Sequence, residues 1–218
     1  MPRCLPQRDG ARGGRGRGPT LPKIVDHDQR RAEVLEATWR VITTVGLHGA
    51  TTRRIAQEAG YSNGVLAHYF ADKADILTSA LQMVHARVRG RMEAAVSRTE
   101  GLAAFRAVLL EALPLDEDRL FEANLEFGYL SHAINATRLR DLYQDERIGF
   151  NEFLHTLVAA ARARDEVRAD LDDAHVVAEA LVFIDGISAQ AVFLPNRMPP
   201  ELQLDLADTF LARISTTD

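Results

Sequence analysis

Apolar residues in this chain recur every three or four positions, the spacing of one face of an α-helix. In residues 26–45 the face comprises Val34, Leu35, Thr38, Val41, Ile42 and Val45, with Trp39 at its flank. Gly46 predicts the end of this helix. From residue 26 onward we find no alternating strand pattern and no repeat, so we predict an all-α fold.

Two short helices are predicted directly after the first one. Thr51 or Thr52 can cap a helix in which Ile55, Ala56 and Ala59 share a face, and Gly60 suits the left-handed residue that ends a helix. Ser62 can cap the next helix, which would bury Leu66 and Phe70. Two short helices joined by a tight turn containing glycine form a helix-turn-helix, whose second helix fits the major groove of DNA.

The remainder of the chain predicts longer helices. Their expected ranges are 72–97, 102–113, 117–136, 137–164, 172–194 and 199–214. The centre of the helix at 172–194 is apolar on nearly every side, so it must be buried on nearly every side. A central core helix and a helix shared between two subunits both satisfy this pattern.

The two parts of the chain differ in net charge. Residues 1–73 carry 12 Lys and Arg against 7 Asp and Glu, whereas residues 74–218 carry 14 against 24. This asymmetry favours a basic module that faces an anionic polymer, although six of the twelve cations lie in the Arg- and Gly-rich stretch 1–25. We expect that stretch to be a disordered arm that either touches DNA or is dispensable.

Composition also bears on the cellular compartment of the protein. The single cysteine, Cys4, permits no internal disulfide, and the arginine-rich start lacks the apolar segment of a secretory signal. No uninterrupted apolar run reaches the roughly 18 residues that suggest a membrane span. A cytoplasmic protein fits these observations.

A specific motif occupies residues 51–73. It reads T-x-R-x-I-A from Thr51, then A-G-x-S-x-G-x-L-x-H-Y-F from Ala59 to Phe70, then Lys73. This pattern closely resembles the DNA-binding signature of the tetracycline-repressor (TetR) family of bacterial regulators. The segments EALPLDEDR, Asp185-Gly186 and LPNRMPPE more loosely resemble the regulatory half of a subgroup that includes choline-responsive repressors.

The resemblance implies domains and partners. We expect a DNA-binding domain at 26–73 and a regulatory and dimerisation domain at 74–218. The helices at 172–194 and 199–214 would form a homodimer, which a palindromic operator requires. A small molecule of unknown identity would release the DNA.

Roles within the motif divide between reading bases and holding phosphates. Asn63 can pair with adenine, Val65 can touch a thymine methyl, and Gly64 permits close approach. Arg53 can reach phosphate or guanine. His68 and Tyr69 resemble the family's phosphate-contacting pair, and Lys73 resembles its backbone clamp. The full set of candidate DNA-binding residues is Thr52, Arg53, Ser62, Asn63, Gly64, Val65, Ala67, His68, Tyr69 and Lys73. Ala67 stands where the family often has tyrosine, and His68 taken alone reads as a surface residue.

The larger half carries polar groups in apolar surroundings. An aromatic pocket with a carboxylate would suit a cation, although phenylalanines at helical spacing are more often core residues. The candidate ligand-binding residues are Phe105, Phe121, Glu126, Tyr129, His132, Phe153 and Asp185.

Other classes of protein find little support in the sequence. The seven histidines show no H-E-x-x-H or other ligand spacing, and no G-x-S-x-G, C-x-x-C or phosphate loop occurs. We therefore expect no enzyme activity, no metal and no cofactor. An uncatalogued all-α enzyme stays open as an alternative, as does a helical dimeric interaction module, which would leave Arg53, Tyr69 and Lys73 unexplained.

Overall fold

Helices account for nearly all the regular structure of the chain. The computed structural model describes residues 27–134 and 137–216, without the side chains of Leu47, His48, His132 and Arg138, so the predicted arm at 1–25 lies outside the described residues. The helices are α1 (His27–Gly49), α2 (Thr52–Glu58), α3 (Asn63–Tyr69), α4 (Lys73–Val96), α5 (Gly101–Ala112), α6 (Glu117–Ala133), α7 (Thr137–Arg162), α8 (Asp173–Phe193) and α9 (Pro200–Ile214). The all-α prediction is confirmed.

The starts of four helices follow from their capping side chains. Thr51 accepts a hydrogen bond from the N–H of Arg54 at 3.3 Å, and Ser62 accepts one from Val65 at 3.3 Å. Asp72 caps α4 and Asp172 caps α8 in the same way. Each cap pairs a helix N–H that would otherwise lack an intrahelical partner.

Two glycines end helical segments as the sequence predicts. Gly60, which follows α2, has φ of 73°, and Gly46 interrupts α1 with φ of 71°. Such angles cost an L-residue with a side chain about 1–2 kcal/mol, and glycine avoids this cost. Because the helix breaks at Gly46, Val45 is 40% exposed and does not join the buried face expected for it.

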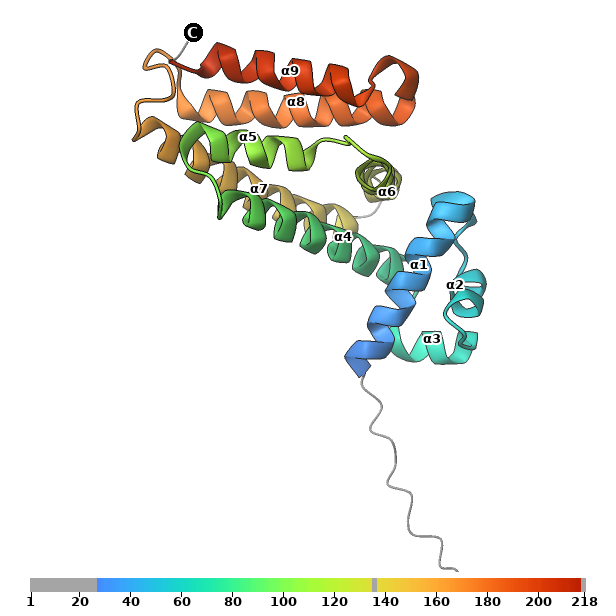
Figure 1. Cartoon of the computed structure of the whole chain (residues 1–218). Helices are drawn as coiled ribbons and strands as arrows, with labels where there is room; N and C mark the ends of the chain where they lie inside the picture. Colours follow the sequence, from blue (N-terminus) through green and yellow to red (C-terminus); the bar gives the residue numbers. More distant parts are fainter. Residues whose placement is uncertain (1–26, 135–136, 217–218) are drawn as a thin grey trace, which may run out of the picture.

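The molecule has two hydrophobic clusters, which we call the small core and the large core. The small core joins α1, α2 and α3 to the first half of α4 and includes Val34, Ile55 and Phe70. The large core lies among α5, α7, α8 and α9 around Phe105 and Leu154. In Figure 1, α1–α3 form one end of the molecule, and α4 leads from them to a layered bundle in which α9 is outermost.

Helix α6 belongs to the small core as well as to the bundle. Its residues Leu125, Tyr129 and Ala133 are buried in the small core. Phe121, one turn earlier, meets Trp39 of α1 edge-on at a ring distance of 4.3 Å. The small core therefore extends beyond residues 26–73, through α4 as far as Val84 and into α6.

Helix α8 lies in the outer part of the bundle. It is long and apolar enough to cross a membrane by length and composition, with a mean hydropathy of 1.7. One side is packed in the large core through residues such as Val177 and Ile184. Its other side leaves Val182 73% exposed and Phe193 68% exposed.

Candidate nucleic-acid interface and internal cavity

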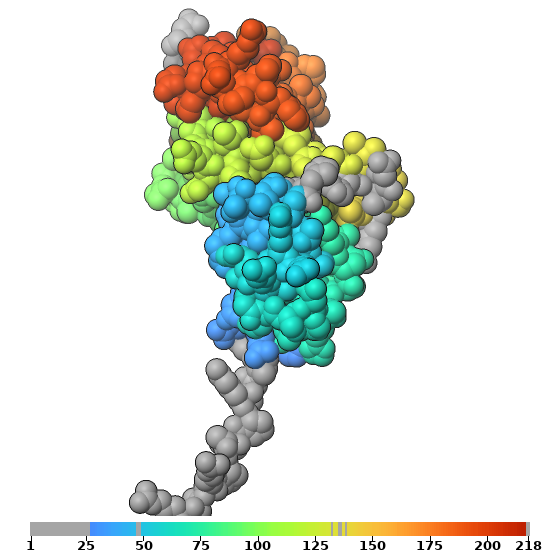
Figure 2. Space-filling model, turned by 90° about the vertical axis from the view of Figure 1, so that its right-hand side faces the viewer, coloured from blue at the N-terminus to red at the C-terminus, as the bar shows by residue number. Residues whose placement is uncertain are grey.

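The predicted DNA-binding residues lie mainly on the outer side of α2 and α3, while Leu66 and Phe70 face the small core. Figure 2 shows these helices at the narrow end of the molecule. Thr52, Arg53, Ser62, Asn63, Gly64, Ala67 and His68 are exposed, and Val65, Tyr69 and Lys73 are half-buried. The hydroxyl of Ser62 caps α3, so Ser62 sets the start of that helix.

Gly64 occupies an unusual position for a glycine. A Cβ atom there would meet only the Ser62 hydroxyl oxygen, at an ordinary distance of 3.7 Å. Glycine inside a helix costs about 1 kcal/mol relative to alanine. The chain's own packing therefore leaves room for a side chain at this position.

Arg31 of α1 holds the end of α3 in place. Its guanidinium donates to the backbone oxygen of Tyr69 at 2.7 Å and to the hydroxyl of Ser79 at 2.6 Å. It also lies 4.3 Å from the centre of the Phe70 ring. One side chain thus ties α1, α3 and α4 together beside the recognition surface.

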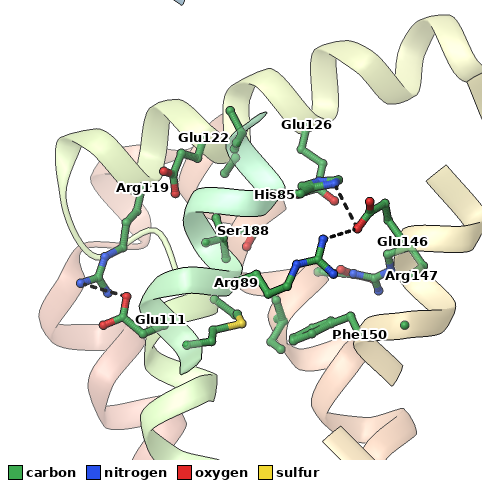
Figure 3. Close-up of a pocket in the computed structure, with 18 of the residues that line it drawn as sticks. His85, Arg89, Glu111, Arg119, Glu122, Glu126, Glu146, Arg147, Phe150 and Ser188 are labelled. Carbon is green, nitrogen blue, oxygen red and sulfur yellow. Dashed lines mark hydrogen bonds and ion pairs between the residues drawn. The ribbon is translucent and has the colours of Figure 1, made fainter. Parts of the chain in front are cut away.

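A cavity of about 410 Å³ lies between α4, α5, α6, α7 and α8 (Figure 3). That volume is within the range of pockets that hold small organic molecules. Its apolar walls are formed by Val84, Val88, Met92, Ala112, Ala123, Phe127, Leu130, Phe150, Phe153 and Ile184. The polar lining comprises His85, Arg89, Glu93, Glu111, Arg119, Glu122, Glu126, Tyr143, Glu146, Arg147, Asp185 and Ser188.

At one end of the cavity the carboxylates are paired with arginines. Glu122 is buried and accepts two hydrogen bonds from Arg91, at 2.9 and 2.6 Å. Arg91 also reaches Glu111 at 3.2 Å, and Arg119 lies 3.6 Å from the same carboxylate. The hydrogen bond with Glu122 is the main reason that the pKa of Arg91 is raised.

The other end has a different balance of charge. Arg89 pairs with Glu146 at 3.0 Å, and Arg147 pairs with Asp185 at 2.8 Å. Glu126 accepts a hydrogen bond from the Tyr143 hydroxyl at 3.1 Å and, among the described residues, has no ion pair.

These surroundings change two pKa values. Burial, together with the nearby charge of Glu126, raises the pKa of Tyr143 well above its ordinary value. Burial also raises the pKa of Asp185, an effect that Glu126 strengthens and Arg147 opposes. Among the described residues, this end has three carboxylates, Glu126, Glu146 and Asp185, beside two arginines, and His85 lies 4.0 Å from Glu146.

The structure brings some of the predicted ligand-binding residues together and separates others. Glu126, Phe153 and Asp185 line the cavity. Phe105 does not, because it is fully buried in the large core. The side chain of His132 lies outside the described residues.

Two further predicted residues lie at the junction with the small core and away from the cavity. Phe121 packs on Trp39, and Tyr129 is buried with its hydroxyl donating to the backbone oxygen of Leu139 at 3.0 Å. Helical periodicity shows that such residues are buried but does not show which neighbour buries them.

Several cavity residues were not predicted. The α4 residues His85, Arg89 and Met92 and the α7 residues Tyr143, Glu146 and Arg147 come from helices that the sequence showed only as long and amphipathic. A usable signal did exist in α6, where Glu122 and Glu126 lie four residues apart beside apolar positions. Carboxylates on one partly apolar helix face need a partner or a ligand.

The described residues hold no cluster of His, Cys, Asp and Glu that could bind a metal ion. What the arrangement offers is a helix-turn-helix with an exposed recognition face and an internal cavity bordered by α4 and α6.

Comparison with known proteins agrees with this geometry. Residues 34–80 match the model of the bacterial regulatory proteins of the tetR family, and residues 101–216 match that of the BetI-type transcriptional repressor, C-terminal. The HTH-type transcriptional regulator PksA of Bacillus subtilis is 30% identical over 179 residues, covering 82% of this chain and 86% of PksA. The HTH-type transcriptional regulator BetI of Escherichia coli is 27% identical over 202 residues, covering 91% of this chain and all of BetI. These relatives are transcription regulators and not enzymes.

Solved structures share the fold. A transcriptional regulator from Saccharomonospora viridis in complex with choline superposes with a TM-score of 0.80 at 21% identity, over 86% of this chain and 98% of that one. A TetR transcription regulator from Haloarcula marismortui gives a TM-score of 0.78 at 21% identity, over 87% of this chain and 100% of that one. Taken with the two family matches, these findings show that the chain belongs to the TetR family of bacterial transcriptional regulators and carries a BetI-type repressor C-terminal domain.

Proposed function

We propose that this regulator binds a palindromic operator as a dimer and leaves it when a small molecule enters the cavity. In this scheme residues 26–73 contact DNA and residues 74–218 bind the effector and the second subunit, all in the cytoplasm. The observation that carries the proposal is the position of α6. Glu122 and Glu126 of this helix face the cavity, while Leu125 and Tyr129 are buried in the small core that supports α2 and α3.

DNA contact is assigned to two kinds of residue. Asn63 and Val65 at the start of α3 read base edges, and Gly64 lets the helix approach closely. Thr52, Arg53, Tyr69 and Lys73 hold the phosphate backbone, and Ser62 positions α3 through its cap. Ala67 and His68 complete the exposed side of the helix.

The dimer is assigned to α8 and α9. Val182 and Phe193 are 73% and 68% exposed on α8, and Leu202 is 37% exposed on α9. Large apolar side chains gathered on one outer layer are typical of an interface between subunits. A two-fold axis through these helices would place two copies of α3 for successive half-sites, roughly 34–36 Å apart or somewhat farther.

We assign the release of DNA to a shift in the populations of two conformations of the regulator. A ligand changes DNA affinity only by as much as its affinities for the two conformations differ. Helices α4 and α6 border the cavity and also belong to the small core, so a ligand that moves either helix changes the position of α3. Coupling of about 1–3 kcal/mol would alter operator affinity roughly 5- to 150-fold.

Two experiments test the proposal. Genomic DNA fragments are selected by their binding to the purified protein, and the molar mass of the protein in solution is measured by light scattering. We expect an inverted-repeat site and a mass of two chains. Val182→Glu should yield single chains with much weaker operator binding. Ile148→Glu, which alters a residue 57% exposed on α7, is the matched control and should stay dimeric. A wild-type mass of one chain, or retention of no fragment, would contradict the proposal.

A further inference from the structure

The charges in the cavity specify a class of ligand. Of the six lining carboxylates, Glu111, Glu122, Glu146 and Asp185 each lie within 4 Å of an arginine, and Glu93 is exposed to solvent. Glu126 is half-buried and, within the part of the chain that the structure describes, receives only the hydroxyl of Tyr143. An ionised carboxylate offers about four acceptor sites, so most of the hydrogen-bonding capacity of Glu126 is unused.

A second, independent observation points to a ligand in the same space. Ser188 of α8 is only 9% exposed and lines the cavity, where Figure 3 shows it among the polar residues. Among the described residues no hydrogen bond to its hydroxyl is found, and the oxygen is not one of the fully buried unpartnered atoms, so the hydroxyl is open to the cavity. A ligand in the cavity can therefore form a hydrogen bond with it.

The rest of the cavity lining indicates which chemical groups the ligand carries away from its charge. Met92, Phe150 and Phe153 form an apolar wall. The far end, at Glu111 and Glu122, is already neutralised by Arg91 and Arg119. A single positive charge on a ligand would balance Glu126, with apolar groups extending away from it.

Resting on the effector role proposed above, we propose that the cavity takes a protonated amine with an apolar body, whose N–H groups donate to Glu126. A quaternary ammonium fits less well, since it has no N–H donor and would leave the acceptors of Glu126 unpaired in a partly dry site. Such ions are recognised mainly by the faces of aromatic rings. An anion would meet Glu126 and Asp185 as like charges.

The test uses four probes with one shared body: 4-phenylbutylamine, its N,N,N-trimethyl derivative, 4-phenylbutanol and 4-phenylbutyrate. Isothermal titration of the full-length protein without DNA gives each affinity. We expect the primary amine to bind most tightly. Glu126→Gln keeps the side-chain shape and should weaken amine binding about tenfold or more, with little effect on the alcohol. Glu152→Gln, which changes an exposed carboxylate of α7 outside the cavity lining, is the matched control and should change neither.

Three results would overturn the ligand class: equal or tighter binding of the trimethyl compound, binding of none of the probes, or a Glu126→Gln loss shared equally by the amine and the alcohol. Operator titrations with and without the saturating probe then separate the two proposals. Release of DNA by the trimethyl compound and not by the amine would refute the amine and support the effector role. Tight amine binding with superimposable operator curves would support the amine and refute the effector role for it.

Discussion

Arg31 gives the sharpest test of how α1 supports the DNA-binding surface. Its guanidinium makes two hydrogen bonds, to the Tyr69 backbone at 2.7 Å and to Ser79 at 2.6 Å, and it stacks on Phe70 at 4.3 Å. Its side chain is 39% exposed, so solvent screening reduces each contribution. We take about 1 kcal/mol for each hydrogen bond and about 0.5–1 kcal/mol for the ring contact.

Arg31→Ala should therefore lower the free energy of unfolding by about 2–3 kcal/mol. At about 2–4 °C per kcal/mol for a chain of this size, Tm falls by roughly 4–12 °C. Because Tyr69 and α3 lose an anchor, operator affinity should fall about tenfold at a temperature where the variant is fully folded. Thermal unfolding followed by circular dichroism and fluorescence anisotropy with labelled operator measure the two effects.

Arg40→Ala is the matched control on the same helix. Among the described residues, Arg40 forms an ion pair with Glu58 alone, at 2.7 Å, and its side chain is 54% exposed, so its loss should cost at most about 1 kcal/mol. The reasoning fails if both variants unfold at the same temperature and bind operator equally. It also fails if Arg31→Lys, which keeps the charge without the planar fork, restores wild-type behaviour completely.

Three further predictions concern the two sites. Lys73→Ala should weaken binding to operator and random DNA alike and reduce the slope of log affinity against log salt concentration by about one unit. Asn63→Ala should instead alter which DNA sequences are preferred, and an equal loss of affinity for operator and random DNA would refute its role in base reading. Gly64→Ala should raise Tm slightly, because the added Cβ meets only Ser62 at 3.7 Å, while lowering operator affinity; unchanged affinity would show that no partner approaches there. Burial raises the pKa of Asp185 above the ordinary 3.8, so the folded state holds that proton more tightly than the unfolded state. The free energy of unfolding therefore falls as pH rises from 3.8 through the higher folded-state pKa. Asp185→Asn should remove this part of the dependence of Tm on pH, and parallel curves of Tm against pH for the two proteins would contradict it.

The sequence predicts the features that depend on residues close together in the chain. The caps Thr51, Ser62, Asp72 and Asp172 lie at helix starts because each side chain satisfies an N–H within three residues of itself. The outer side of α3 was predictable for the same reason, since periodicity separates Leu66 from its exposed neighbours. These features need no knowledge of the rest of the fold.

The cavity depends on long-range packing, and there the sequence predicts less. Phe105 and Phe153 both lie on apolar helix faces, yet one is sealed in the large core and the other borders the cavity. The ion pairs that leave Glu126 without a cation join residues far apart in sequence, such as Arg89 with Glu146. No spacing rule along the chain shows which carboxylate will remain uncompensated.

The position of α6 also bears on how such regulators are recombined. A chimera that joins this DNA-binding segment to another effector domain at the α4 junction would lose Leu125, Tyr129 and Ala133, and thereby open part of the small core. Deleting buried side chains as large as those of Leu125 and Tyr129 costs about 2–5 kcal/mol each, depending on how far the site collapses. A grafted receptor half must therefore supply a helix of matching shape at this place, so the portable unit of this regulator is larger than its helix-turn-helix.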